Sequence, residues 1–325
     1  VFGNHFATVG GTTHRLDRHP VMSKHPVTPM DEADLRLHLS KQTQKRIGLV
    51  DIVDLAANEQ LIGQALEREL GAGAEIVIFD ALDDEKLQKT GGLIWQEAQK
   101  GQMFAAGSSG IEYALSAYWR KAGMLQNEQT QLPELNEADK LLVLSGSCSP
   151  VTQGQIEHAL DSGFEGIKIS GSELVDEQTA GTAVARVLEQ AENILADGKS
   201  VVLYTALGPD DESIGQTRNK LVQQGLDPSE TGSRIGSRLG EMCRHLVKTC
   251  GLKRVLCAGG DTSGYTVKQL GIYGLETLAP TEPGVPLCRA YSEHQAFDGL
   301  QIALKGGKMG KPDFFSKVKQ LKSSR

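Results

Sequence analysis

The sequence predicts an α/β protein of two domains with largely parallel sheets flanked by helices. Three observations lead to this prediction. The chain has 325 residues, more than a single hydrophobic core usually supports. Short continuous apolar runs alternate with amphipathic stretches, which is typical of parallel strands buried on both faces. One polar, non-periodic segment, 124–140, is the best candidate for a linker.

The first domain is expected to span residues 1–130. Its apolar runs and the helical patterns that follow them are 46–55 with 57–70, 74–81 with 83–99, and 102–110 with 111–123. A helix is also expected within 28–39, where Thr28 is a suitable N-cap.

The second domain is expected to span residues 131–325. Its apolar runs are 140–150, 163–174, 199–208, 254–258 and 300–304, and its helical patterns are 151–163, 176–196, 235–250, a stretch after 259–264, and a short basic stretch at 312–325. In 282–290, two prolines and a glycine indicate a rigid extended turn, or a wall for a flat adenine ring.

Composition narrows the class of partner. The net charge is −7, which argues against a nucleic-acid backbone as the main partner. No uncharged apolar run reaches about 18 residues, so no membrane span is expected. Five cysteines form no CxxC pair and no zinc spacing. With no signal peptide visible, this pattern favours a reduced, cytoplasmic setting.

Three junctions in the second domain share one design, a strand followed by a loop of small residues. They are 145–150, 259–264 and 305–310. Glycine lets a backbone approach a phosphate, and a following helix offers free N–H groups. Each loop alone is equally well explained as a tight corner between a strand and a helix. Three of them at one edge of a parallel sheet favour a phosphate site, to which Lys305 and Lys308 would add positive charge.

Asp261 is the unusual residue of the second loop. A carboxylate beside a phosphate repels it unless a cation intervenes, so a role in holding Mg²⁺ is one interpretation. A helix N-cap explains the residue equally well.

Two segments of the first domain are candidates for binding a carboxylate or a polyol. The stretch 14–29 is rich in His, Arg and Pro, cannot form a helix, and offers Arg15, Arg18 and His19 as donors. A solvated basic loop is the alternative, and a metal site built from the histidines of this stretch is a weaker one. Ser108 and Ser109 lie between two glycines and resemble an anion-binding nest.

Six motifs, taken in order, resemble the four-carbon acid sugar kinase family, whose members phosphorylate threonate, erythronate or 3-oxo-tetronate. They are "RLDRHPVMSKHPVTPM", "GSSG", "SGSCSPVTQGQI", "AGGDTSG", "PGVPLCRA" and "ALKGGKMGKPDFF". The resemblance implies a sugar-acid-binding domain at 1–130, an ATP-binding domain at 131–325, a ligand site in the cleft between them, and the cofactors ATP and Mg²⁺. By position it implies ATP contacts at Ser147, Ser149, Gly259, Gly260, Asp261, Thr262, Gly307 and Gly310. Whether the protein forms a homo-oligomer is left open.

The chain departs from the family in one motif. The family begins with a strand that ends in Asp-Asp-x-Thr-Gly, and neither Asp-Asp pair here, at 83–84 or 210–211, continues in that way. We therefore expect the chain to lack the family's N-terminal segment and, with it, the general base. The alternative is then that the chain is a truncated, non-catalytic protein whose function is to bind a nucleotide or a sugar acid. A dinucleotide-dependent oxidoreductase is disfavoured because GxGxxG is absent.

Overall fold

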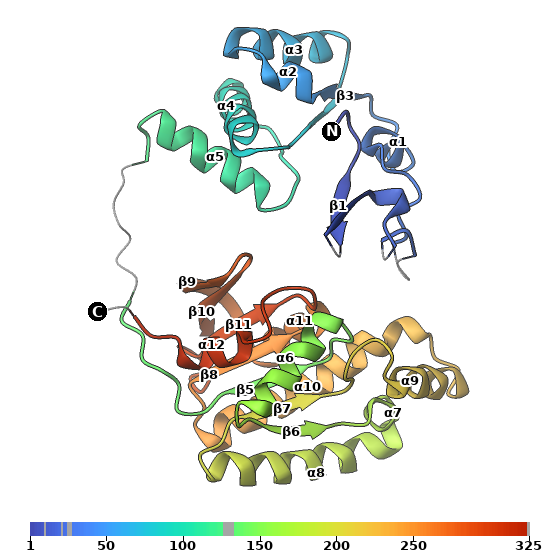
Figure 1. Cartoon of the computed structure of the whole chain (residues 1–325), viewed down its shortest axis with the longest axis vertical. Helices are drawn as coiled ribbons and strands as arrows, with labels where there is room; N and C mark the ends of the chain where they lie inside the picture. The colour runs from blue at the N-terminus through green and yellow to red at the C-terminus, as the bar shows by residue number, and fades with distance from the viewer. Residues whose placement is uncertain (10, 21, 25–27, 126–132, 324–325) are drawn as a thin grey trace. The chain divides into compact units, whose positions relative to one another are not determined.

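The computed structural model describes residues 1–325 except 10, 21, 25–27, 126–132 and 324–325. The chain divides into two compact units, Val1–Thr130 and Gln131–Arg325, which Figure 1 draws in blue to green and in green to red. The predicted α/β class is confirmed, since both units alternate strands with helices. The linker candidate 124–140 falls partly outside the described residues. No helix among the described residues has the length and apolar content needed to span a bilayer.

Unit 1 contains two small sheets and the helices around them. Its elements are β1 (Phe6–Val9), β2 (Thr12–Arg15), η1 (Leu16–Arg18), η2 (Met22–Lys24), α1 (Leu35–Ser40), β3 (Ile47–Val50), α2 (Ile52–Ala56), α3 (Glu59–Gly71), β4 (Ile76–Phe79), α4 (Asp84–Lys100) and α5 (Gly110–Lys121). Strands β1 and β2 form an antiparallel hairpin, and β3 and β4 pair in parallel. The core beside β3 is small and includes Val50, Leu55, Ile62 and Leu93.

Two expectations for unit 1 are wrong. Helix α1 begins at Leu35, and its N-cap is Asp34, whose carboxylate accepts from the N–H of Arg36, so Thr28 is not the cap. The apolar run at 102–106 forms no strand, and the side chain of Phe104 is 91 % exposed. A short apolar run forms a strand only where a neighbouring strand can pair with it, and the run at 102–106 has no such neighbour among the described residues.

Unit 2 is built on a seven-stranded sheet. Its elements are β5 (Leu142–Ser145), α6 (Pro150–Asp161), β6 (Glu165–Lys168), α7 (Gly171–Val175), α8 (Glu177–Ala196), β7 (Val201–Tyr204), α9 (Glu212–Gln223), η3 (Pro228–Glu230), α10 (Thr231–Cys250), β8 (Arg254–Ala258), α11 (Gly260–Gln269), β9 (Ile272–Glu282), β10 (Val285–Ser292), β11 (Gln301–Lys305) and α12 (Phe314–Gln320). The strand order is β6-β7-β5-β8-β11-β10-β9. The first five strands are parallel, as predicted.

The other two strands of this sheet differ from the expectation. Residues 282–290, expected as a rigid turn, lie mostly in β10, which pairs antiparallel with both β9 and β11. The turn is confined to Pro283 and Gly284, where the glycine has φ +75°. The prolines do not prevent pairing here, because Pro286 lies at an irregularity of the β9–β10 register, opposite Pro280.

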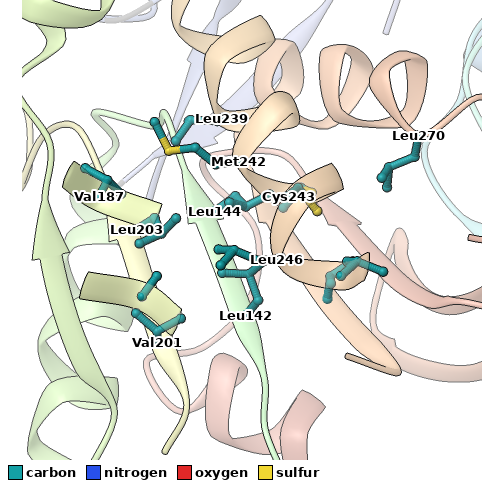
Figure 2. Packing of buried hydrophobic residues seen from close by; sticks show 14 of the residues in the cluster. Leu142, Leu144, Val187, Val201, Leu203, Leu239, Met242, Cys243, Leu246 and Leu270 are labelled. Carbon is teal, nitrogen blue, oxygen red and sulfur yellow. The ribbon is translucent and has the colours of Figure 1, made fainter. Parts of the chain in front are cut away.

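Helices cover both faces of the sheet. On one face, α8 and α10 pack on β5 and β7 through an apolar cluster that Figure 2 shows, with Leu144, Leu203, Val187 and Leu246 among its members. The sequence specifies these helices clearly: α8 begins after its N-cap Asp176, and α10 ends at a glycine in the left-handed region. The opposite face is covered by α6 and α12.

The chain leaves two neighbouring strands of the sheet toward opposite faces. After β5 it enters α6, which packs in one cluster, and after β8 it enters α11, which ends in the other cluster. Strands β5 and β8 are adjacent and parallel. An open α/β sheet forms a crevice at its carboxyl edge where successive connections diverge in this way, and ligands bind there.

Candidate functional site

The carboxyl ends of three parallel strands lie at one level of the unit 2 sheet. Ser145, the last residue of β5, pairs with Ala258, the last residue of β8. Ala258 also pairs with Lys305, the last residue of β11. The loops that follow therefore leave the sheet side by side. We name them loop 1 (146–149), loop 2 (259–262) and loop 3 (306–310), and together the cradle.

Loops 1 and 2 approach closely because glycine stands at both contact points. The N–H of Gly146 donates to the carbonyl of Ala258 at 3.3 Å. A Cβ on Gly146 would lie 2.4 Å from Oγ1 of Thr262, and a Cβ on Gly259 would lie 3.5 Å from the backbone nitrogen of Ser147. Gly259 also has φ +123°, which side-chain-bearing residues rarely adopt.

Loops 1 and 3 are in direct contact. A Cβ on Gly307 would lie 2.5 Å from Oγ of Ser147 and 3.3 Å from Cβ of Ser149. The same Ser147 oxygen accepts a hydrogen bond from the N–H of Ser149 at 3.2 Å. The serines and the glycine that the sequence singled out therefore lie together, although they are separated along the chain by the whole of unit 2.

Free amides gather at this edge of the sheet. Within the part of the chain that the structure describes, no backbone hydrogen bond reaches the N–H groups of Ser147, Gly260, Asp261 and Thr262. The first amide of α11 with a partner is that of Ser263, which donates to the carbonyl of Gly259 at 2.9 Å. Unpaired amides at a helix start carry partial positive charge and bind anions.

The N-cap interpretation of Asp261 is wrong. The residue at the N-cap position of α11 is Gly259, and Asp261 lies inside the first helical turn. Glycine takes the cap position because the backbone there has a positive φ that aspartate adopts poorly. The side chain of Asp261 is exposed, and a Cβ on Gly232 would lie 2.3 Å from its Oδ2, so its carboxylate lies beside the start of α10.

Two polar residues of α6 hold loop 3, and sequence reasoning missed both. Gln155 donates from Nε2 to the carbonyls of Met309 at 2.9 Å and Lys311 at 3.0 Å. Thr152 donates from Oγ1 to the carbonyl of Gly307 at 2.8 Å. The sequence contains one weak indication of their role: both are polar residues on the buried face of an amphipathic helix, where residues are usually apolar.

Lys305 is buried beneath the cradle. Its side chain is 1 % exposed, and Nζ donates to Oγ1 of Thr152 at 3.0 Å. Burial lowers the pKa of Lys305 to about 8. Lys308, the other lysine considered for charge neutralisation, is exposed in loop 3.

A recess of about 320 Å³ lies at the same sheet edge and is lined by Lys168, Ser170, Asp211 and Ser213, among others. Lys168 Nζ pairs with the buried carboxylate of Asp211 at 2.8 Å. Burial raises the pKa of Asp211, but hydrogen bonds from Lys168 and from the N–H of Leu207 outweigh it and hold that pKa below its usual range. Sequence reasoning missed this pair because its members lie on different elements.

The donors predicted for a sugar acid in unit 1 are only partly available. Arg15, at the end of β2, donates from Nε to Asp17 at 2.8 Å, and this hydrogen bond raises the pKa of Arg15. Arg18 ends η1 and is exposed. His19 is buried, and its Nδ1 accepts from the N–H of Met22 at 3.1 Å.

Ser108 and Ser109 are exposed at the start of α5. Oγ of Ser108 accepts from the N–H of Gly110 at 3.3 Å, which is an ST turn, so this amide is not free as a nest would require. Among the described residues, no hydrogen bond joins these serines to Arg15 or Arg18. The two halves of the proposed carboxylate site therefore remain separate predictions.

No group of three or more His, Cys, Asp or Glu side chains able to hold a metal ion is found in the described residues. The metal site considered above would consist of His14, His19 and His25, of which His25 lies outside those residues. His14 and His19 are in contact, with ring centroids 5.8 Å apart and edge-to-face.

Family models match most of the chain. Residues 142–315 match the nucleotide-binding C-terminal domain, and residues 1–115 match the sugar-binding N-terminal domain. The cradle lies wholly within the first of these matches.

Curated relatives are similar over nearly the whole chain. A 3-oxo-isoapionate kinase of Paraburkholderia graminis is 40% identical over 320 residues, which is 98% of this chain and 67% of the relative. A 3-oxo-tetronate kinase of Pseudomonas savastanoi pv. phaseolicola is 31% identical, covering 92% of this chain and 65% of the relative. The chain thus spans about two thirds of the length of the curated relatives it matches.

Solved structures share the fold. A Salmonella typhimurium LT2 protein described as a tRNA synthase aligns with a TM-score of 0.70 at 23% identity, over 95% of this chain and 68% of its own. A Haemophilus influenzae protein aligns with a TM-score of 0.60 at 22% identity, over 98% of this chain and 72% of its own. With both family models and a relative at 40% identity in agreement, the chain belongs to the four-carbon acid sugar kinase family.

Proposed function

We propose that the protein containing this chain is an ATP-dependent kinase that phosphorylates a hydroxyl group of a 3-oxo sugar acid. The observation that carries the proposal is the cradle. Its three loops meet at glycines at one edge of a parallel sheet, and loops 1 and 2 present amides that are unpaired within the described residues. Phosphoryl transfer depends mainly on positioning and charge neutralisation, which is the chemistry that such an edge supplies.

Roles for the cradle residues follow from their positions. The unpaired amides of Ser147, Gly260 and Thr262 would donate to the phosphates of ATP. Ser149 and Gly259, whose amides already donate to Oγ of Ser147 and to the carbonyl of Lys305, would line the same site. Gly307 and Gly310 would keep loop 3 close to that anion. In loop 3, φ at Gly310 is +87°, and a Cβ there would lie 3.0 Å from Nε2 of Gln155.

Mg²⁺ fits this site through a single side chain. Proteins usually bind Mg²⁺ through one or two carboxylates, with waters and substrate phosphates completing the shell. Asp261 belongs to the first turn of α11, whose amides would hold the phosphates, and its exposed carboxylate lies beside Gly232 at the start of α10. The ion would neutralise part of the charge on the transferred phosphoryl group.

Unit 1 would bind the sugar acid. Its proposed contacts are Arg15, Arg18, His19, Ser108 and Ser109, and no general base is assigned among the described residues. The relatives' names favour a 3-oxo acid over threonate or erythronate: the relative at 40% identity is a 3-oxo-isoapionate kinase, and the one at 31% is a 3-oxo-tetronate kinase. The cytoplasmic setting and a homo-oligomeric state stay predictions.

The test is ADP release by the whole natural protein with ATP and Mg²⁺. The acids compared are 3-oxo-isoapionate, 3-oxo-tetronate, D-threonate, L-threonate and D-erythronate. Turnover with a 3-oxo acid, with a kcat/KM at least about tenfold above the others, supports the proposal. ADP release that does not depend on the acid, or no release with any of the five, contradicts it.

A further inference from the structure

Lys305 is a buried cation with no carboxylate partner in the described part of the chain. Its side chain is 1 % exposed. Among the described residues, its Nζ makes one hydrogen bond, to Thr152, and no ion pair. An ammonium group carries three donors, and burying a charge without an opposite charge is costly. A charged lysine at such a position therefore lowers the stability of the folded protein unless another group compensates its charge.

The side chains around Lys305 do not provide that compensation. The titratable and charged groups on the neighbouring elements are Arg254 and Cys257 on β8, Cys288, Arg289 and Tyr291 on β10, Asp261, Tyr265 and Lys268 on α11, Glu157, His158 and Asp161 on α6, Lys317 and Lys319 on α12, Cys148 in loop 1 and Lys308 in loop 3. None of them forms a hydrogen bond or an ion pair with the Lys305 ammonium in the described part of the chain. Burial is accordingly the only cause that lowers its pKa.

The ammonium is coupled to the cradle through one hydroxyl group. Thr152 has a single hydroxyl proton, which it donates to the carbonyl of Gly307 at 2.8 Å, so the same oxygen accepts from Lys305 at 3.0 Å. The backbone carbonyl of Lys305 accepts from the N–H of Gly259 at 2.9 Å. Lys305 is thus bonded to loop 2 by its backbone and, through Thr152, to loop 3 by its side chain.

We infer that Lys305 is a positioning residue of the cradle whose ammonium is compensated by the phosphates of the bound nucleotide, so that nucleotide binding draws a proton onto this lysine. The inference rests on the proposed binding of nucleotide at the cradle. In the free protein, desolvation disfavours the charged lysine. Phosphates held by loops 1 to 3 bring negative charge to the same low-dielectric region and favour the charged form.

Calorimetric titration of the whole protein with ADP, in two buffers of different ionisation enthalpy, measures this proton directly. The phosphates of ADP are already ionised at alkaline pH. With a pKa of about 8 in the free protein, we expect uptake of about half a proton at pH 8, about a tenth at pH 7 and most of a proton at pH 9. This dependence needs no variant, so a folding defect cannot obscure it.

Two lysine variants assign the proton. Lys305→Met keeps the length of the side chain and removes the charge, and we expect it to abolish uptake and weaken ADP binding by about tenfold or more. Lys308→Met removes the exposed lysine of loop 3, and we expect uptake to persist in it. A merely structural Lys305 would give a different result: Lys305→Met would lower the melting temperature, whereas we expect the ligand-free variant to melt at or above the wild type.

Bound ADP without proton uptake at pH 8 and 9, or uptake that persists in Lys305→Met, overturns the inference and leaves the proposed kinase untouched. Conversely, ADP binding with uptake but no turnover of any sugar acid contradicts the kinase and supports the role of Lys305. No binding of ADP at all overturns both.

Discussion

Replacing Gly307 by alanine is expected to open the contact between loops 1 and 3. The new Cβ would lie 2.5 Å from Oγ of Ser147 and 3.3 Å from Cβ of Ser149. Contacts below about 3 Å require something to move. Oγ of Ser147 is the terminal atom of its side chain, but it accepts a hydrogen bond from the N–H of Ser149. Rotating it away breaks the bond that shapes loop 1.

The expected cost follows from these two contacts. A lost hydrogen bond costs about 1 kcal/mol, and a methyl group forced into a packed contact costs about 1–3 kcal/mol. The lower flexibility of alanine in the unfolded chain returns about 0.5 kcal/mol. We therefore expect a net loss of about 2 kcal/mol, which would appear as a roughly 30-fold weaker affinity for ADP if the loops must close on the ligand, or as a melting temperature lower by about 4–8 °C.

Isothermal titration with ADP and thermal denaturation of the ligand-free protein are the assays. Ser147→Ala combined with Gly307→Ala removes the clashing oxygen, and we expect the pair to recover at least about 1 kcal/mol relative to additivity. Gly154→Ala is the matched control, because a Cβ there meets no atom within 4 Å and α6 gains helix propensity. Gly307→Ala with unchanged affinity and stability, or strict additivity with Ser147→Ala, would refute the reasoning.

Three further predictions concern other groups of unit 2. Arg254→Lys is expected to lower the free energy of unfolding, measured by urea denaturation, by about 3 kcal/mol. The reason is that the guanidinium donates to Gln301 and to four backbone carbonyls. The affinity of the folded protein for ADP should not change. Burial lowers the pKa of Lys305 to about 8. The unfolded chain therefore keeps this proton to higher pH, and the free energy of unfolding of the wild type, relative to that of Lys305→Met at the same pH, should rise between about pH 8 and pH 10.5. Cys148 is exposed, but desolvation and Asp211 raise the pKa of its thiol, so its alkylation should be slow near neutral pH. Bound ADP should slow this alkylation further, as measured by mass spectrometry. Equal rates with and without ADP would contradict a ligand at loop 1.

Much of unit 2 was predictable because several of its parallel strands are short and mostly apolar. β5 and β8 are buried at every position, so their sequences carry a clear signal, and the loops after them are defined by where that signal stops. Ser145, Ala258 and Lys305 each end a strand. Because the three strands are parallel neighbours, these residues lie at the same edge of the sheet. Strand order itself is set by tertiary packing, and the sequence alone did not indicate it.

Other features escaped prediction for identifiable reasons. Antiparallel β9 has mostly exposed residues in its first half, and such a strand has no continuous apolar run. Asp261 satisfies the composition rule for an N-cap, but the positive φ of Gly259 moved the helix start two residues earlier. The link between Thr152 and Lys305 joins residues 153 apart, a distance over which local patterns carry no information.

A crystal structure of the protein with ADP tests the cradle most directly. The account predicts the β-phosphate within hydrogen-bonding distance, about 2.7–3.2 Å, of backbone amides in loops 1 and 2, with loop 3 against it and Lys305 bonded to Thr152 beneath it. ADP bound away from all three loops, for example in the basic recess beside Phe164, Lys317 and Lys319 at α12, would contradict it.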